Sequence, residues 1–348
     1  MSIDKWNDWK WQVENSITSV AHVSNKMISC GYNMRIPPYY LSLMNENIDC
    51  PIRMQAVPSK KELEKPGTDY EKYGINISDS LNEKKYSPVP HLVHRYPDRV
   101  MLEVTNNCFM YCRFCTRKRL TKVDKAQNTL QQALEYIRVH SDIRDVLLSG
   151  GDPLTLEDFQ LEEIVSTIRN IKHVEIIRIG TRAPVVMPMR ITDELVTMLQ
   201  KYHPIWINTH FNHPLEITIQ SQNACEKIVN AGIPMGNQSV LLKGINDNVD
   251  VYKELCLKLV KMRVRPYYLY QCDLGEGLEQ FRTKINVGIN IIKELQQNIT
   301  GFAIPQFVID APNGGGKIAI APNNIVEWTH EYIKLKNARG DEYFYPEI

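Results

Sequence analysis

From about residue 99 onwards, short runs of apolar residues alternate with longer stretches in which apolar positions recur every three or four residues. The short runs have the length of strands and lie at Val100–Val104, Asp145–Ser149, Glu175–Gly180, Pro204–Thr209, Met235–Leu242, Arg265–Cys272 and Gln306–Asp310. Helical patterns lie between them, at about 125–140, 156–171, 192–202, 215–231, 248–263 and 284–298. This alternation predicts a parallel sheet with helices outside it, as a full or partial α/β barrel.

The chain before the first of these strands has a different pattern. Residues 1–95 mix short helical stretches with proline-rich turns such as Ile36–Pro38 and Ser87–Pro90, which predicts an N-terminal arm without sheet periodicity. The predicted barrel occupies residues 96–320, and residues 321–348 are expected to form a short C-terminal extension. In such a barrel the functional side chains gather at the carboxyl ends of the strands, where the following loops converge.

The composition suits a globular enzyme that acts on a small molecule. A chain of 348 residues with 43% hydrophobic content can bury a sizeable core. Its 41 basic and 40 acidic residues leave a net charge of +1, so no basic surface is expected for nucleic acid or an anionic membrane. No apolar run approaches the roughly 18 residues that a membrane-spanning helix needs. Five cysteines, Cys30, Cys50, Cys225, Cys256 and Cys272, are scattered, which predicts a reducing, cytoplasmic location.

The other three cysteines stand close together just after the first predicted strand. Cys108, Cys112 and Cys115 have C-x3-C-x2-C spacing, so three thiolates could hold a four-iron cluster and leave one iron open. Soft thiolate ligands favour iron–sulfur clusters or zinc over hard cations. A closed structural zinc site would need a fourth ligand, which this segment does not supply. An iron–sulfur cluster is the leading prediction, with zinc or buried free thiols as alternatives.

A second motif, Asp310–Lys317, places three glycines directly before a lysine. The glycines would let the backbone approach a bound group closely. A Walker A loop is excluded, because Ala311 and Ile318 stand where that loop needs glycine and Ser or Thr. A lysine presented in this way could bind pyridoxal 5′-phosphate (PLP) through an imine. The alternative is an exposed lysine beside a flexible glycine turn.

These motifs occur together, and in the same order, in the lysine 2,3-aminomutases, a family of radical S-adenosylmethionine (SAM) enzymes. The stretches that carry the resemblance are Pro88–Arg99, Asn107–Arg117, Val146–Asp152, Asn208–Pro214, Gly236–Ser239 and Asp310–Lys317, with Trp6–Gln12 near the N-terminus. The chain resembles this family along nearly its whole length. The resemblance implies a partial (βα)6 radical SAM barrel, a [4Fe-4S] cluster whose open iron binds SAM, and an isomerase that moves an amino group within its substrate.

The resemblance also implies which residues bind the cofactors. Lys317 would hold PLP, and Tyr270 would lie against its ring. Arg95 and Arg99 would bind the phosphate, for which a planar guanidinium is better suited than an ammonium group. The residues implied for SAM are Ser149, Gly150, Gly151 and Asp152 at its methionyl end, with His210 and Gln238 as further contacts.

The implied substrate is an amino acid with a positively charged side chain. By the resemblance, Arg117 would clamp the α-carboxylate in a bidentate pair, and Asp273 and Asp310 would bind the distal ammonium. Two carboxylates in one pocket repel each other unless a cation joins them. The expected reaction moves the α-amino group of L-lysine to the β-carbon, giving β-lysine. The alternatives are arginine or ornithine as substrate, a lysine of elongation factor P, and a cluster-bearing regulatory protein without activity.

One departure from the family concerns a second metal. Longer members add C-terminal cysteines that help hold a structural zinc, but no cysteine follows Cys272 in this chain, so no structural zinc is expected. The partners implied are a small-molecule amino acid, an electron donor such as flavodoxin or ferredoxin, and further copies of the chain in a homo-oligomer. Neither nucleic acid nor a membrane is expected as a partner.

Overall fold

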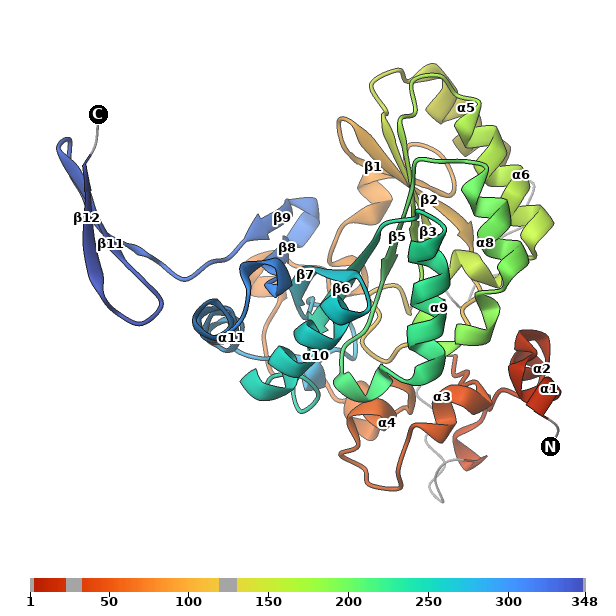
Figure 1. Ribbon diagram of the computed structural model, residues 1–348, viewed down its shortest axis with the longest axis horizontal. Coiled ribbons are helices and arrows are strands. Elements are labelled where there is room, and N and C mark those ends of the chain that lie inside the picture. Colours follow the sequence, from red (N-terminus) through yellow and green to blue (C-terminus); the bar gives the residue numbers. More distant parts are fainter. Residues whose placement is uncertain (1–2, 23–32, 119–129, 347–348) are drawn as a thin grey trace.

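The computed structural model describes residues 3–22, 33–118 and 130–346. Its main sheet has nine strands that follow one another in the order of the sequence (Figure 1). They are β1 (Leu92–Tyr96), β2 (Arg99–Thr105), β3 (Asp145–Gly150), β4 (Ile176–Gly180), β5 (Ile205–Thr209), β6 (Met235–Leu241), β7 (Val264–Gln271), β8 (Gln306–Ala311) and β9 (Gly316–Ala319). Strands β2 to β8 are parallel, whereas β1 and β9 pair antiparallel at the two edges. The predicted parallel strands are therefore confirmed.

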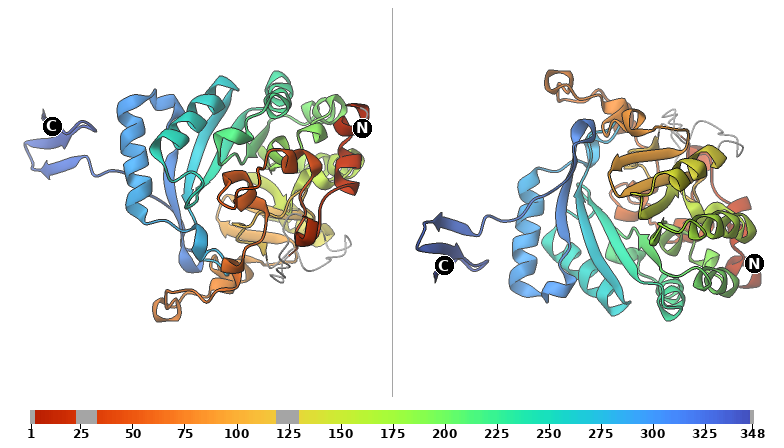
Figure 2. Two further views of the ribbon diagram at one scale, coloured as in Figure 1. Left: turned by 90° about the horizontal axis from the view of Figure 1, so that it is seen from below. Right: turned by 90° about the horizontal axis from the view of Figure 1, so that it is seen from above.

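Helices connect the parallel strands and cover the outside of the curved sheet (Figures 1 and 2). They are α5 (Leu130–Val139), α6 (Asp158–Arg169), α7 (Ala183–Val186), α8 (Asp193–Gln200), α9 (Ile219–Asn230), α10 (Val249–Lys261) and α11 (Ile285–Asn298). Thr192, Thr218 and Asn248 cap α8, α9 and α10, because each side chain accepts a hydrogen bond from a backbone N–H of the first turn. The first five residues of the helix predicted at 125–140 lie outside the described residues.

Each parallel strand directs one row of apolar side chains towards these helices. Val146, Leu148, Ile177 and Ile179 are all 0% exposed and belong to one continuous core with the buried residues of the helices. The residues that alternate with them, such as Ser149, are only half-buried. Because successive side chains of a strand point to opposite faces, the helix-covered face carries the core and the other face carries the more accessible polar residues.

The N-terminal arm packs on the barrel through buried aromatic and aliphatic residues. Its helices are α1 (Ile3–Asn7), α2 (Trp9–Glu14), α3 (Pro38–Ser42) and α4 (Pro51–Ala56). Tyr39 is 2% exposed and Tyr40 is 0% exposed, and their hydroxyl groups reach Thr218 at 2.6 Å and Glu216 at 2.7 Å. The arm is thus attached to the segment between β5 and α9.

Residues 1–95 were predicted to form an arm without sheet periodicity, but a strand begins at the end of this range. Strand β1 begins at Leu92 and pairs antiparallel with β2, with Leu92 opposite Leu102 and Val93 opposite Met101. A five-residue edge strand shows little periodicity of its own, and it forms here because a tight turn at Pro97 and Asp98 brings it beside β2. The boundary at residue 95 therefore cuts through a strand of the main sheet.

The C-terminal extension forms a small separate sheet. Strands β10 (Ile325–Trp328), β11 (Tyr332–Lys336) and β12 (Glu342–Pro346) are antiparallel and project from the body of the protein (Figures 1 and 2). Trp328, Phe344 and Tyr345 in this sheet are 63–65% exposed. Among the described residues, no helix is long and apolar enough to cross a bilayer.

Candidate active site

The three motif cysteines lie on the loop that leaves the carboxyl end of β2, and this loop is held against the end of β3. The backbone N–H of Gly151 donates to the carbonyl oxygen of Thr105 at 2.6 Å, and that of Asp152 donates to Asn107 at 2.7 Å. A Cβ atom on Gly151 would lie 2.1 Å from the carbonyl oxygen of Asn107. Glycine is therefore required where two segments of the protein meet, rather than only for the approach of a cofactor.

The cysteine thiols fit an iron–sulfur cluster in their chemistry. Burial raises the pKa of Cys108 and Cys115, and the neighbouring thiols of the motif raise it further. Three adjacent thiolates therefore need an electropositive partner, which the irons of a cluster would supply. Within the described residues, no three His, Cys, Asp or Glu side chains stand around one metal position. The loop places the three thiols close enough for their charges to interact.

Asp152, expected at the methionyl end of SAM, is already engaged by the protein. Its Oδ1 accepts from the backbone N–H of Leu154 at 3.0 Å and from the hydroxyl of Thr181 at 2.7 Å. Its Oδ2 accepts from the backbone N–H of Arg182 at 2.8 Å. Burial raises the pKa of Asp152, whereas these three hydrogen bonds lower it. The carboxyl group therefore joins the ends of β3 and β4, and its contact with SAM stays a prediction.

His210 offers a polar atom that the protein does not use. Its Nε2 is buried and has no hydrogen-bond partner among the described residues. Burial, followed by the charge of Arg182, lowers the pKa of His210 to about 3, so the ring is neutral near pH 7. The ring packs against Phe114 of the cysteine loop with centroids 5.3 Å apart. A buried, unpartnered ring nitrogen beside this loop fits a ligand contact. Gln238, also expected near SAM, is half-buried on β6.

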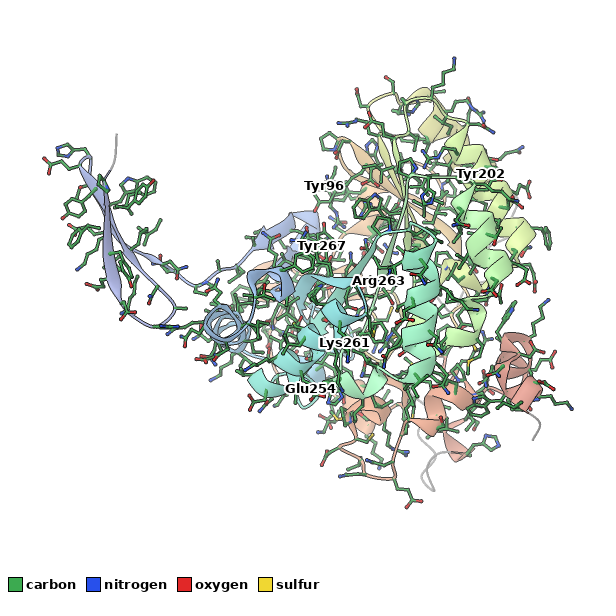
Figure 3. The ribbon with its side chains drawn as sticks, viewed as in Figure 1. Tyr96, Tyr202, Glu254, Lys261, Arg263 and Tyr267 are labelled. Atoms are coloured by element: carbon green, nitrogen blue, oxygen red, sulfur yellow. The ribbon has the colours of Figure 1, made fainter. Side chains whose placement is uncertain are left out.

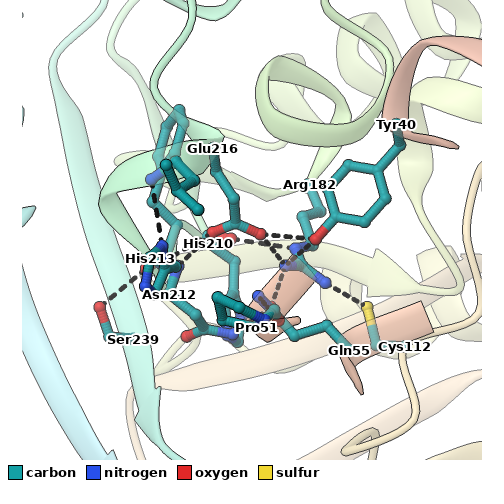
Figure 4. Close-up of polar contacts among 12 residues, drawn as sticks. Tyr40, Pro51, Gln55, Cys112, Arg182, His210, Asn212, His213, Glu216 and Ser239 are labelled. Atoms are coloured by element: carbon teal, nitrogen blue, oxygen red, sulfur yellow. Dashed lines mark hydrogen bonds and ion pairs between the residues drawn. The ribbon is translucent and has the colours of Figure 1, made fainter. Parts of the chain in front are cut away.

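A charged network that sequence analysis missed lies against the cysteine loop (Figure 4). Arg182 follows β4 and donates from Nη1 to Sγ of Cys112 at 2.9 Å. Its Nη2 lies 2.7 Å from Oε1 of Glu216. Burial would lower the pKa of Arg182, but Cys112, Tyr40 and Glu216 raise it, so the guanidinium stays charged. In the sequence, only its position just after a predicted strand indicated that Arg182 could lie in a functional site. That position does not show which residues it contacts.

Lys317 and Asp310 meet because β8 and β9 form a hairpin. The two residues are opposite each other in the antiparallel register, and Nζ of Lys317 lies 3.2 Å from Oδ1 of Asp310. The same ammonium lies 5.5 Å from the centroid of the Tyr270 ring on β7. The backbone N–H of Lys317 donates to the hydroxyl of Tyr96 at 3.1 Å. Tyr96, labelled in Figure 3, therefore links the β1–β2 hairpin to the β8–β9 hairpin.

The glycines before Lys317 allow this contact between the hairpins. A Cβ atom on Gly314 would lie 2.3 Å from the ring of Tyr86, and one on Gly316 would lie 3.1 Å from the Tyr96 hydroxyl. Both glycines also have positive φ values, +82° and +83°. Residues other than glycine rarely adopt this backbone conformation. The glycine motif thus lets the lysine loop pack against two tyrosines from the beginning of the chain.

Asp273 completes an acidic pair with Asp310. Burial is the main reason that its pKa rises to about 7, and repulsion by Asp310 adds to the rise. Lys317 and Arg95 act in the opposite direction. Asp273 lies two residues after the end of β7 and is close enough to Asp310 for the two charges to interact. Their joint role in binding a substrate stays a prediction. A cation that binds beside the two carboxyl groups would favour the ionised form of Asp273 and lower its pKa.

The two arginines expected at the PLP phosphate lie on the β1–β2 hairpin. Arg95 donates from Nη2 to the carbonyl oxygen of Leu81 at 2.7 Å, and its Nε is buried without a partner among the described residues. That orphaned donor fits an anionic group such as a phosphate. Arg99 lies 3.8 Å from the centroid of the Tyr96 ring, and its Nη1 lies 2.9 Å from Oδ1 of Asp98. Both arginines are therefore near the segment that presents Lys317.

Arg117 binds a carboxylate, but one that the protein itself supplies. Its Nε and Nη2 donate to Oε1 of Glu83 at 2.9 and 2.6 Å. Glu83 belongs to the 3-10 helix η5 (Glu83–Tyr86) and lines a cavity of about 660 Å³, whose other walls include Asn82, Glu103 and Asn313. Sequence analysis missed Glu83, because nothing in a short turn of the arm indicates that it meets the cysteine loop. The predicted role of Arg117 in binding the α-carboxylate of the substrate stays a prediction.

Comparison with known proteins identifies the family. Residues 102–255 match the model of the radical SAM superfamily, and residues 292–348 match the model named lysine-2,3-aminomutase. An L-lysine 2,3-aminomutase of Acetoanaerobium sticklandii is 51% identical, covering 98% of this chain and 84% of that protein. One of Clostridium subterminale is 50% identical, over 96% of this chain and 83% of its own length. A glutamate 2,3-aminomutase of Clostridioides difficile is 42% identical, covering 97% of this chain and 82% of that protein.

These matches confirm the resemblance that the motifs indicated. The superfamily match confirms the predicted radical SAM barrel and implies a [4Fe-4S] cluster and SAM as cofactors. The similarity of the relatives extends over almost every element described above, including the arm and both hairpins. The chain therefore belongs to the lysine 2,3-aminomutase family, a family of isomerases within the radical SAM superfamily.

Proposed function

We propose that this protein uses PLP, together with SAM and its cluster, to convert L-lysine to β-lysine. The observation that carries the proposal is the acidic pair Asp273 and Asp310 beside the ammonium group of Lys317. The substrate named for the relatives at 48–51% identity is lysine. One relative at 42% identity is named for glutamate, so the substrate must be argued from the pocket itself.

The pocket favours a substrate with a distal positive charge. Asp273 is buried with a pKa of about 7, and a cation bound beside it would lower that pKa and stabilise both carboxylates. The γ-carboxylate of glutamate would instead add a third negative charge. The same acidic pair would accept arginine or ornithine, which is why the experiment below compares all of these amino acids.

Arg117 would bind the α-carboxylate of the substrate. The backbone of Arg117 is fixed beside Cys115, because its N–H donates to the sulfur of that cysteine at 3.3 Å. The Glu83 carboxylate now occupies the guanidinium fork, so a substrate carboxylate must share it or displace Glu83. Arg117 and the acidic pair would then fix the two ends of the amino acid.

The remaining residues would hold the cofactors. Cys108, Cys112 and Cys115 would bind the cluster, and Lys317, Arg95, Arg99 and Tyr270 would bind PLP. The residues proposed for SAM are Ser149, Gly150, Gly151, Asp152, His210 and Gln238. When bound, SAM on the reduced cluster supplies a 5′-deoxyadenosyl radical for hydrogen abstraction, and PLP supplies an electron-withdrawing ring that carries the migrating nitrogen. The protein positions these groups so that the radical meets one C–H bond.

We further propose three features of its setting. A flavodoxin or ferredoxin would donate the electron, and the chain would assemble as a homo-oligomer. A cytoplasmic location is supported by the described cysteines, all of which are free thiols.

The test is an anaerobic assay with reconstituted cluster, PLP, SAM and dithionite. Lysine, arginine, ornithine, glutamate and elongation factor P are offered separately, and α- and β-amino acids are separated by chromatography. We expect lysine to be converted fastest, and both Asp273→Asn and Asp310→Asn to raise its KM. Asp250→Asn, an exposed aspartate on α10, is the matched control.

Three results would contradict the proposal. Faster turnover of arginine or ornithine would mean that the proposed reaction is right but that lysine is not the preferred substrate. Cleavage of SAM with modification of elongation factor P alone would make a protein lysine the substrate. Unchanged KM values in both aspartate variants would remove the acidic pair from substrate recognition.

A further inference from the structure

Arg182 is held in one orientation by contacts on three sides (Figure 4). Its Nε donates to the carbonyl oxygen of His210 at 3.0 Å. Its Nη2 donates to Oε1 of Gln55 at 2.5 Å and to Oε1 of Glu216 at 2.7 Å. The side chain is only 8% exposed. Because a guanidinium is planar and rigid, these contacts determine where Nη1 lies, and it lies 2.9 Å from Sγ of Cys112.

The positive charge of Arg182 is matched by one buried carboxylate. The Glu216 side chain is 0% exposed, and its Oε1 also accepts from the hydroxyl of Tyr40 at 2.7 Å. Its Oε2 accepts from the backbone N–H groups of Asn212 at 2.6 Å and His213 at 3.0 Å. A buried ion pair is tolerated when its remaining donors and acceptors are satisfied in this way. Arg182 therefore donates an N–H to the sulfur of Cys112, while Glu216 balances its positive charge.

The three sulfurs of the motif differ in what they accept. Cys112 accepts from a charged side chain, and Cys115 accepts from the backbone N–H of Arg117 at 3.3 Å. In the described parts of the chain, the sulfur of Cys108 accepts no hydrogen bond, although its carbonyl oxygen accepts from Arg35 at 3.0 Å. A charge-assisted hydrogen bond is roughly twice as strong as a neutral one. Cys112 is thus the sulfur on which the protein acts most strongly.

We propose that Arg182 is a positioning residue that raises the reduction potential of the cluster through its hydrogen bond to Cys112. Reduction adds one electron to the cluster, and donors to its sulfurs stabilise the more electron-rich state. Gln55 gives the N-terminal arm a part in this control, since its side-chain oxygen accepts a hydrogen bond from the guanidinium. The inference depends on the cluster that the proposed function also requires, but it does not depend on the amino acid that is converted.

The experiment measures the midpoint potential of the reconstituted holoenzyme in a dithionite titration followed by electron paramagnetic resonance. Arg182→Lys keeps the charge, but one ammonium group is expected to pair with Glu216 and release Cys112. The double variant Arg182→Met with Glu216→Gln removes both charges and the hydrogen bond together. Tyr40→Phe is the matched control, because it loses a bond of the same network that does not touch a sulfur.

We expect both Arg182 variants to bind a full complement of iron and sulfide. At a fixed potential, their ratio of reduced to oxidised cluster should fall about tenfold, which corresponds to 59 mV for a one-electron couple. Tyr40→Phe should leave the ratio unchanged. Equal potentials in all variants would overturn the proposal, and so would a shift in Tyr40→Phe as large as that in Arg182→Lys.

If the variants fail to fold or to bind the cluster, the proposal can still be tested on the unmodified protein. Resonance Raman spectra recorded in H2O and D2O should show a deuterium shift of an iron–cysteine stretch. Absence of any such shift would overturn the proposal. If the chain binds a cluster with these properties but converts no lysine, the proposed function fails and this inference stands. If it binds no cluster, both fail.

Discussion

Two regions of the site differ in whether their buried charges are compensated within the protein. The sulfur side consists of Cys112, Arg182, Glu216, Gln55 and Tyr40, and it pairs one cation with one carboxylate inside a complete set of hydrogen bonds. The amino-acid side consists of Asp273, Asp310, Lys317, Tyr270 and Arg117 with Glu83. There Asp273 is left with a pKa of about 7. On the sulfur side the buried charges are compensated within the protein, whereas on the amino-acid side a buried carboxyl group keeps a raised pKa beside a second carboxylate.

The difference follows from the elements that build each region. The sulfur side is enclosed by the N-terminal arm and by the ends of β4 and β5, so the charges of Arg182 and Glu216 are desolvated and must be compensated within the protein. The amino-acid side lies where two hairpins meet, and Glu83 borders a cavity of about 660 Å³. A buried carboxyl group with a strongly raised pKa is a feature that occurs often in binding sites.

Replacing Lys317 should abolish the function of the amino-acid side and leave that of the sulfur side intact. In Lys317→Ala we expect no detectable conversion of lysine and no visible absorption from bound PLP, since the imine-forming group is lost. The cluster content and the reductive cleavage of SAM should persist, because the sulfur side does not involve Lys317. Iron analysis and quantification of 5′-deoxyadenosine measure this, with Lys336→Ala in the C-terminal sheet as control. Loss of the cluster in Lys317→Ala would mean that the regions are not independent.

Breaking the ion pair of the sulfur side should have the largest effect on stability. Glu216→Ala leaves a buried guanidinium without its carboxylate and should lower the free energy of unfolding by about 3–5 kcal/mol. Removing both charges in the double variant of Arg182→Met and Glu216→Gln should cost far less. Urea unfolding monitored by circular dichroism compares the two. Equal losses in both variants would show that the partners are not coupled.

Asp273→Asn should stabilise the protein at high pH. The folded pKa of about 7 lies above the ordinary value of 3.8, so the contribution of this carboxyl group to stability is full below about pH 4 and is lost as the pH rises to 7. The variant should therefore gain up to about 4 kcal/mol at pH 8 and almost nothing at pH 4. Urea titrations at both pH values measure the gain. A gain that does not depend on pH would contradict the assignment.

The same carboxyl group should make lysine binding depend on pH. Below about pH 7 Asp273 is protonated, so KM for lysine should rise by up to about tenfold per unit of falling pH. The dependence should be absent in Asp273→Asn, whose KM is raised at all pH values. Initial rates between pH 6 and pH 9 provide the comparison, and persistence of the dependence in the variant would assign it to another group.

Most of the barrel and part of the site were predictable from local patterns. The seven parallel strands follow from short apolar runs separated by helical periodicity, and the cysteine loop follows from the spacing of Cys108, Cys112 and Cys115. The meeting of Lys317 with Asp310 is also local, because a hairpin brings residues seven positions apart into register. The roles carried over for SAM and PLP residues such as Ser149 and Arg99 stay predictions.

Only the tertiary structure decided which distant charges become partners. Strand β1, the bond from Arg182 to Cys112, and the pairing of Arg117 with Glu83 each join segments that no periodicity connects. The sequence by itself determined the seven parallel strands, most of the helices between them, the reactive residue types and the family. Closure of the barrel and docking of the arm determined which charges are buried together, because desolvation and Coulomb attraction depend on distance in space rather than on position in the chain.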